Sequence, residues 1–288
     1  MQPPLDSMLE AYDVRSLRDQ KNAIKEVMQE LVLCGLSRAG FFDRAAFYGG
    51  TALRIFYGLD RFSEDMDFSL MTPDETFDLA EWFGSIEREL RSCGMNVEME
   101  KKDKRVDSDI QSTFLKGNTR EHLLVCYPNE NFSSGVPRDE RTKIKIEIDV
   151  NPPQLATYER RYQLLPSPYE VNLYDQPSLF AGKIHAVLCR SWKNRIKGRD
   201  LYDYLFYLGR GAKVNLPHLQ ARLEQTGHWD PIDELSAEKL RAMLADRFDS
   251  IDFKAAAKDV EPFLRDSTSL QIWSPDLFKQ ATDKLEAR

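Results

Sequence analysis

The segment 142–151 constrains the fold of this chain more than any other part of the sequence. Aliphatic and charged residues alternate strictly there, in the order Thr-Lys-Ile-Lys-Ile-Glu-Ile-Asp-Val-Asn. Side chains two residues apart in an extended strand point to the same face of a sheet. One face of this strand is therefore fully apolar and the other fully charged, which predicts a sheet with one buried face and one polar face.

Strand patterns are confined to the first part of the chain, and helical patterns dominate after about residue 176. Besides 142–151, strands are expected at 45–48, 66–70, 97–101, 112–115 and 122–127, and helices at 16–37, 51–57 and 73–92. Further helices are expected at 177–191, 198–209, 217–225, 236–248 and 274–286. These patterns predict an α+β fold, with a mixed β-sheet flanked by helices in residues 1–155 and a helical domain in residues 156–288.

Composition excludes several classes of protein. With 42% hydrophobic residues, a chain of 288 residues can bury a core, so disorder is not expected. The net charge of −7 argues against a basic coat, although a local basic patch can still bind nucleic acid. No stretch has the length of a membrane helix or the layout of a signal peptide. Because the four cysteines are scattered, we expect a cytoplasmic protein with reduced thiols and no membrane partner.

Residues 47–70 combine two features of nucleotide chemistry. Gly49-Gly50-Thr51 stands before an apolar helical run, and a glycine turn that opens a helix offers backbone N–H groups and a hydroxyl to a phosphate. Asp65 and Asp67 follow in an expected strand, so their carboxylates project side by side. Adjacent carboxylates repel, and a divalent cation is the commonest reason to place them together. Alone, each pattern is typical of a turn or a solvated strand edge; together they favour phosphate and metal binding.

The charged face of the 142–151 strand offers a third carboxylate. Glu147 and Asp149 both fit, and Glu147 is preferred because it lies nearer the middle of the strand. Three convergent carboxylates can hold one or two Mg²⁺ ions, or Mn²⁺, with phosphate oxygens completing the coordination shell. The alternative for this face is a solvated outer surface.

In the helical half, Lys183 and Asp200 are the candidate chemical groups. Lys183 lies beside apolar residues at helical spacing, so its ammonium either reaches solvent or points into a cleft as a charge on a triphosphate. Asp200 falls near a helix start, where capping is an equally simple explanation. A basic run with a tryptophan precedes it, as in an RNA phosphate track or a solvated loop (Trp192, Lys193, Arg195, Lys197, Arg199).

Taken in order, these motifs resemble those of the AbiEii/AbiGii toxin family, nucleotidyltransferase-like proteins of bacterial type IV toxin–antitoxin and phage-abortive systems. The matching motifs are Gly-Gly-Thr, Arg-Phe-Ser-Glu-Asp-Met-Asp-Phe, Ile-Lys-Ile-Glu-Ile, Ala-Gly-Lys-Ile-His-Ala and Gly-Arg-Asp-Leu-Tyr-Asp, within residues 45–210. The family belongs to the DNA polymerase β-like nucleotidyltransferases, which hold metals with an Asp-x-Asp pair and a third acid.

The resemblance implies a role for each matched residue. Catalytic roles fall on two acids of the strand-rich half and two residues of the helical half (Asp65, Asp67, Lys183, Asp200). Nucleotide contacts would come from the glycine turn, the residues before the acid pair and the lysine (Gly49, Gly50, Thr51, Arg61, Ser63, Lys183). Metal ligands would be the acid pair with one of the two strand acids (Asp65, Asp67, Glu147, Asp149). Lys183 would neutralise the departing pyrophosphate, and Asp200 would accept or orient the acceptor's proton.

The expected reaction is the Mg²⁺-dependent transfer of a nucleoside monophosphate from a nucleoside triphosphate to an acceptor hydroxyl, with the helical domain completing the active-site cleft. The resemblance points to RNA, tRNA in particular, as the acceptor and to a cognate antitoxin as a partner. Two alternatives stay open: a nucleotidyltransferase that acts on a small molecule or a protein, and a non-catalytic binding scaffold. The intact set of motif residues argues against the scaffold.

Overall fold

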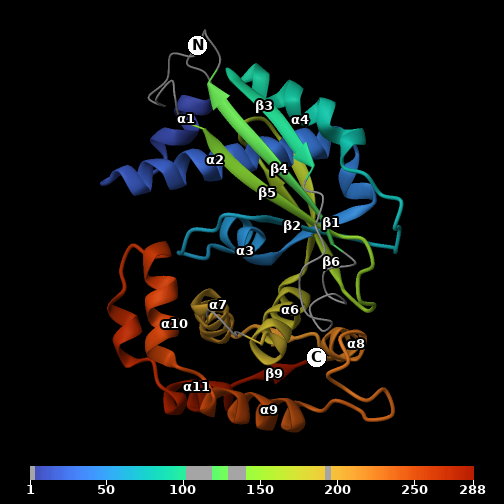
Figure 1. Cartoon of the computed structure of the whole chain (residues 1–288), viewed down its shortest axis with the longest axis vertical. Coiled ribbons are helices and arrows are strands. Elements are labelled where there is room, and N and C mark those ends of the chain that lie inside the picture. The colour runs from blue at the N-terminus through green and yellow to red at the C-terminus, as the bar shows by residue number, and fades with distance from the viewer. Residues whose placement is uncertain (1–3, 102–118, 129–140, 192–195) are drawn as a thin grey trace. The chain divides into compact units, whose positions relative to one another are not determined.

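The computed structural model of the chain describes residues 4–101, 119–128, 141–191 and 196–288, which form two compact units (Figure 1). The sheet unit comprises Met1–Ala52, Ser63–Pro152 and Glu159–Leu173. The helical unit comprises Leu53–Phe62, Pro153–Tyr158 and Tyr174–Arg288. The predicted α+β class is confirmed, because one unit contains a mixed sheet with helices and the other is mostly helical. The predicted domain boundary at residue 155 stays a prediction.

Within the described ranges, seven strands form one sheet in the order β3-β4-β5-β2-β1-β7-β6. The strands are β1 (Ala45–Tyr48), β2 (Met66–Leu70), β3 (Met95–Lys101), β4 (Thr119–Pro128), β5 (Thr142–Asp149), β6 (Tyr158–Gln163) and β7 (Tyr169–Tyr174). The sheet is mixed, because β2 runs parallel to β5 and β1 runs parallel to β7, whereas β1 is antiparallel to β2 and β4 is antiparallel to both β3 and β5.

Two helices pack against the sheet and against each other. They are α2 (Leu17–Arg38), which contacts β5, and α4 (Ala80–Ser92), which contacts β3 (Figure 1). The two helices approach closely at Gly35, where a Cβ would lie 2.9 Å from the Cα of Ile86. The short helix α1 (Pro4–Glu10) contacts α2, and α3 (Gly49–Tyr57) follows β1 directly.

The two-faced strand predicted at 142–151 is confirmed as β5. Its residues Ile144, Ile146 and Ile148 are fully buried. The charged residues between them are exposed or half-buried. Burial of the aliphatic face supplies the hydrophobic free energy that holds this strand in the sheet, and the charged face is left for polar contacts.

Most other predictions for the sheet unit are also confirmed, with one wrong helix start and two unpredicted strands. Helix 16–37 is α2, which is capped by the Ser16 side chain, and the strands at 45–48, 66–70, 97–101 and 122–127 are β1 to β4. The helix expected from residue 73 begins at Ala80, because the Asp74 and Asp78 side chains hold turns by accepting the N–H groups two residues on. Strands β6 and β7 were not predicted, and the strand expected at 112–115 lies outside the described residues.

The helical unit contains six helices in the part of it that the structure describes. They are α6 (Gln176–Cys189), α7 (Gly198–Gly209), α8 (Leu216–Gln225), α9 (Ala237–Asp249), α10 (Phe253–Val260) and α11 (Pro275–Thr282). Two short strands, β8 (Lys213–Val214) and β9 (Glu286–Ala287), pair in parallel. Short 3-10 helices lie at Phe41–Asp43 in the sheet unit and at Glu261–Phe263 and Thr268–Ile272 in the helical unit.

Side-chain caps explain where most of these helices begin. Five helices are preceded by a residue whose side chain accepts an N–H group of the first turn (Asp175, Asn215, Ser236, Asp252, Ser274). The helix predicted at 274–286 is wrong at its end: α11 stops at Thr282, and the Arg288 N–H then donates to the Val214 carbonyl. Helix α10 was not predicted.

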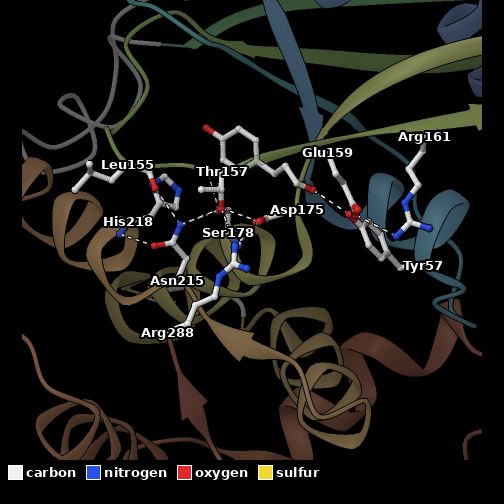
Figure 2. A network of polar contacts seen from close by, with 11 residues as sticks. Tyr57, Leu155, Thr157, Glu159, Arg161, Asp175, Ser178, Asn215, His218 and Arg288 are labelled. Carbon is white, nitrogen blue, oxygen red and sulfur yellow. Dashed lines mark hydrogen bonds and ion pairs between the residues drawn. The ribbon is translucent and has the colours of Figure 1, made fainter.

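Asn215 joins three segments of the helical unit (Figure 2). Its Nδ2 donates to the Leu155 carbonyl at 2.9 Å and to the Ser178 hydroxyl at 3.0 Å, and its Oδ1 accepts the His218 N–H at 3.1 Å. The amide thereby ties the segment before β6 to the starts of α6 and α8. Arg288 lies in the same network and pairs with Asp175, the cap of α6.

The four cysteines are distributed over both units of the chain. All four cysteines are free thiols, and Cys34, Cys93 and Cys126 are buried. Burial raises the pKa of the Cys126 thiol to about 12, so this group is not a reactive thiolate at neutral pH. None of the helices in the described part of the chain is long and apolar enough to cross a membrane.

Candidate active site

The strand register places three carboxylates in a row on the polar face of the sheet. Asp67 of β2 lies opposite Glu147 of β5, and Glu147 lies opposite Glu121 of β4. Neighbouring strands are about 4.8 Å apart, so side chains at opposed positions stand next to each other. Glu121 was not predicted, because no sequence signal fixes the register between β4 and β5.

The same register distinguishes the two candidates for the third acid. Glu147 lies directly beside Asp67. Asp149 lies beside Ser69, which is two residues further along each strand. The carboxylate of Asp149 also accepts the N–H of Asn151 at 3.1 Å. Geometry therefore favours Glu147 as the residue that acts with the aspartate pair.

The Gly-Gly-Thr segment is in contact with both aspartates. The Thr51 hydroxyl donates to the carbonyl oxygen of Asp65, and Thr51 is fully buried. Gly49, the first residue of α3, has a φ of +82°, and a Cβ there would lie 2.1 Å from Oδ2 of Asp67. The segment thus holds one aspartate by a hydrogen bond and makes room for the other by lacking a side chain.

Replacing Gly49 with alanine is expected to displace Asp67. The left-handed backbone alone costs an alanine about 1–2 kcal/mol, and the added methyl group overlaps the carboxylate. We expect a lower melting temperature and a loss of nucleotide transfer, measured by thermal denaturation and by a labelled-nucleotide assay.

Gly84→Ala is the matched control for this substitution. Gly84 lies inside α4 with nothing within 4 Å of a Cβ, so alanine there is expected to stabilise the chain by about 0.5–1 kcal/mol. Equal activity in the Gly49→Ala and Gly84→Ala variants would show that the close approach of Gly49 to Asp67 is unimportant.

The carboxylate row is accompanied by one lysine. The ammonium of Lys145 contacts Oε1 of Glu147 and lies 3.4 Å from Oε1 of Glu121. Burial lowers the pKa of Lys145, but the hydrogen bond to Glu147 and the charges of Glu147, Glu121 and Asp65 outweigh it and leave the pKa raised.

The donor set of this face fits a hard divalent cation. Carboxylate oxygens are the ligands that Mg²⁺ and Mn²⁺ prefer. Asp67 of β2 and Glu147 of β5 supply them from two adjacent strands, and Asp65 directly precedes β2. Within the described residues, no three Asp, Glu, His or Cys side chains are already grouped as metal ligands. Glu147 contacts Lys145 instead, through Oε1.

The functional candidates of the helical unit form an ion-pair network around two buried acids. Lys183 of α6 places its ammonium 2.8 Å from Asp200 and 2.9 Å from Asp203, both on α7. Arg61 binds Asp203 through two hydrogen bonds of 2.6 and 2.5 Å, and Arg190 lies 2.5 Å from Asp200. Three cations thus surround two acids, which leaves the network with a net charge of +1.

Charge pairing controls the protonation of both acids. Burial by itself raises the pKa of Asp200, but Lys183 and Arg190 outweigh it and hold the pKa well below its usual range. The pKa of Asp203 is lowered in the same way by Arg61 and Lys183. Both side chains are therefore carboxylates at neutral pH.

The site residues predicted from sequence fall into two groups. The sheet unit holds the glycine turn, the acid pair, Ser63 and the strand acids, and the helical unit holds Arg61, Lys183 and Asp200. Sequence reasoning missed Lys145, Glu121, Asp203 and Arg190. Only Asp203 had a local signal, because it lies three residues after Asp200 and so shares a face of α7.

The chain is similar to known proteins in both sequence and fold. Residues 31–283 match the model of the family described as "Nucleotidyl transferase AbiEii toxin, Type IV TA system". MenT4, a nucleotidyltransferase toxin from Mycobacterium tuberculosis H37Rv, has 16% identity over 98% of this chain and 99% of its own, with a TM-score of 0.54. JHP933 from Helicobacter pylori has 17% identity over 91% of this chain and 88% of its own, with a TM-score of 0.51.

At these identities the two structures show a shared fold only. No curated protein sequence matches the chain. The family match covers most of the chain and includes all the motifs from Gly-Gly-Thr to Gly-Arg-Asp-Leu-Tyr-Asp. The chain therefore belongs to the AbiEii nucleotidyltransferase toxin family of type IV toxin–antitoxin systems.

Proposed function

We propose that this toxin transfers a nucleoside monophosphate from a nucleoside triphosphate to an RNA acceptor, tRNA in particular. The observation that carries the proposal is the pairing of Asp67 with Glu147 on the polar face of the sheet, beside the Gly-Gly-Thr start of α3. Family membership supports the nucleotidyl-transfer chemistry. The acceptor is proposed from the resemblance to relatives that modify RNA.

Mg²⁺, with Mn²⁺ as a substitute, is the proposed cofactor, and Asp65, Asp67 and Glu147 are its proposed ligands. When bound there, the ion would stabilise negative charge on the phosphate oxygens and on the leaving pyrophosphate. Asp149 is the weaker candidate, because it lies beside Ser69 and accepts the Asn151 N–H.

The first turn of α3 is the proposed phosphate contact in the sheet unit. The backbone N–H groups of Gly50 and Thr51 lie at the positive end of the helix, where anions bind favourably. The hydroxyl of Thr51 holds the Asp65 carbonyl, so its contribution is to fix the aspartate. Contacts from Gly49 and Ser63 to the nucleotide stay predictions.

The proposed contributions of the helical unit are those of Lys183 and Asp200. Two donors of the Lys183 ammonium are held by Asp200 and Asp203, and the third is proposed to neutralise the pyrophosphate. Asp200 has a lowered pKa and is therefore a weak base, which favours an orienting role over proton abstraction. Arg61 is bound to Asp203 and acts in this proposal by holding the network in place; a direct nucleotide contact stays a prediction.

The proposal also includes an RNA-binding segment, a protein partner and a location in the cell. Trp192, Lys193 and Arg195 of the proposed RNA track lie outside the described residues, whereas the Arg199 guanidinium stacks 4.4 Å from the centre of the Phe263 ring. A cognate antitoxin is the proposed partner, in keeping with the family. The cytoplasm is the proposed location, because nucleoside triphosphates and RNA are found there.

The test is a transfer assay with purified protein, Mg²⁺, each α-labelled nucleoside triphosphate in turn and total bacterial RNA. We expect label in tRNA-sized bands and a loss of at least about 100-fold in the Asp65→Ala, Asp67→Ala and Glu147→Ala variants, the size of effect seen when a transition-state charge contact is removed. Asp149→Ala is the matched control, on the same face of the same strand, and is expected to stay active.

Other results of this assay would favour the alternative functions. Pyrophosphate release with small-molecule or protein extracts, but no labelled RNA, would keep the enzyme and overturn the RNA acceptor. An absence of turnover with every acceptor would favour a binding scaffold. Transfer that is unchanged in the Asp67→Ala variant would show that the chemistry does not use this face of the sheet.

A further inference from the structure

Lys145 offsets part of the negative charge of the proposed metal site. Its ammonium contacts Glu147 and lies 3.4 Å from Glu121, and the three side chains are only 31%, 29% and 19% exposed. Contacts that are largely shielded from water are stronger than pairs on an open surface, because the effective dielectric constant is lower. The lysine is therefore held on Glu147, the acid that the register places beside Asp67.

The strand register places Lys145 among acidic residues. Asp65 directly precedes Met66 and Lys145 directly precedes Ile146, and these two followers are paired between β2 and β5. Lys145 is therefore next to Asp65, just as Glu147, two residues further along β5, is next to Asp67. With Glu121 on the next strand, three carboxylates act on one ammonium, those of Glu147, Glu121 and Asp65. Without it, the like charges would repel each other.

A divalent ion that binds Glu147 competes with this ammonium for Oε1, or on Oε2 lies close to it and repels it. If the ion arrives alone, Lys145 loses its nearest partner and keeps only the longer contact to Glu121, so the binding free energy is reduced. A metal–triphosphate complex carries phosphate oxygens that can accept the displaced ammonium, because lysine is a good point-charge partner for phosphate. The lysine therefore opposes the metal alone and favours the metal together with nucleotide.

We propose that Lys145 couples metal binding to nucleotide binding, by holding Glu147 in the nucleotide-free protein and passing its ammonium to the triphosphate when the metal–nucleotide complex binds. This inference rests on the proposed function of Asp65, Asp67 and Glu147. It gives Lys145 a positioning and phosphate-binding role, whereas the sequence motifs gave this residue no role. Since coupling is reciprocal, nucleotide must tighten metal binding by the same factor as metal tightens nucleotide binding.

The test measures Mn²⁺ binding directly, by the electron paramagnetic resonance signal of free Mn²⁺, in the wild type and in the Lys145→Met variant. Each is titrated alone and with α,β-methylene analogues of the four nucleoside triphosphates, which cannot be cleaved. In the variant we expect Mn²⁺ alone to bind about 10-fold more tightly and the tightening by the analogue to shrink by a similar factor, within the range of typical coupling energies.

Lys143→Met is the matched control. Lys143 lies two residues earlier on the same face of β5 and is exposed, so its removal changes the net charge equally without touching Glu147. We expect it to change Mn²⁺ binding by less than about 2-fold, as suits an exposed charge screened by salt. Lys145→Arg keeps a cation beside Glu147, so it should keep weak binding of Mn²⁺ alone; it also serves if Lys145→Met fails to fold.

The outcomes separate this inference from the function on which it rests. If Lys145→Met and Lys143→Met bind Mn²⁺ alike, or if Lys145→Met binds it more weakly, the coupling role of Lys145 is overturned while the metal site stands. If the wild type binds Mn²⁺ no better than Asp67→Ala, the metal site itself is overturned. An arginine variant that binds Mn²⁺ as tightly as Lys145→Met would show that the charge at this position is not what opposes the metal.

Discussion

Replacing Asp203 with alanine is expected to lower the free energy of unfolding by about 3–5 kcal/mol, the usual cost of breaking a buried ion pair from one side. The Asp203 side chain is fully buried, and it accepts two hydrogen bonds from Arg61 and one contact from Lys183. Without it, the buried Arg61 and the half-buried Lys183 lose a shared anion, and the net charge of the network rises from +1 to +2. Urea denaturation of the purified chain, followed by circular dichroism, measures the change.

Asp249→Ala is the control for this prediction, because it also removes an ion-paired aspartate from the helical unit. Asp249 pairs with Lys279 at 2.6 Å, but its side chain is 60% exposed, so the expected cost is below about 1 kcal/mol. If the two variants lose similar amounts of unfolding free energy, burial does not make the Asp203 ion pairs more stabilising than an exposed pair. Replacing the pair together, as Arg61→Met with Asp203→Leu, should recover much of the loss, since no buried charge is then stranded between them.

The effect of Asp203 also depends on pH in a defined direction. Its pKa is lowered in the folded chain, so its contribution is present above the unfolded value of about 3.9 and is lost as the pH falls through the folded pKa. The difference in stability between wild type and Asp203→Ala is therefore expected to be constant above about pH 5 and to shrink below about pH 4. A difference that grows in acid would show that the carboxylate is not the stabilising form.

Local patterns predicted the elements that carry their own periodicity. Strand β5 was predictable because every second residue is aliphatic, and α2 was predictable because an apolar stripe follows a serine cap. Strand β6 was missed because its sequence, Tyr-Glu-Arg-Arg-Tyr-Gln, has no apolar face; it lies at the end of the sheet and most of its side chains are exposed.

Contacts between distant segments explain what sequence could not give for the candidate site. The glycine turn and the acid pair lie close in sequence, so the two motifs could be interpreted together as one candidate site. The partnership of Arg61 with Asp203 joins residues 142 positions apart, and no local pattern encodes it. Glu121 joins the row only through the register of β4 on β5, and the residues between these strands are too many for a tight turn to fix that register.

Gly198→Ala is expected to cost about 3 kcal/mol or more, because the new methyl group meets backbone. A Cβ at Gly198 would lie 1.8 Å from the carbonyl oxygen of Ala256 and 2.8 Å from its carbonyl carbon. The Gly198 N–H also donates to Asp259 at 3.0 Å, so α7 and α10 are in direct contact at this point. Overpacking against backbone cannot be relieved by rotating a side chain, so the helices must separate. Thermal denaturation measures the loss.

Two further variants show whether backbone contact is the cause. Gly209→Ala, at the other end of α7 with nothing within 4 Å of a Cβ, should leave stability unchanged or slightly higher. Ala256→Gly should not rescue Gly198→Ala, because the clash is with the carbonyl group and not with the Ala256 methyl; rescue would place the strain in side-chain packing. Since Asp200 lies two residues after Gly198 and binds Lys183, the separation of α7 from α10 should also lower nucleotide transfer in whatever fraction of the variant stays folded.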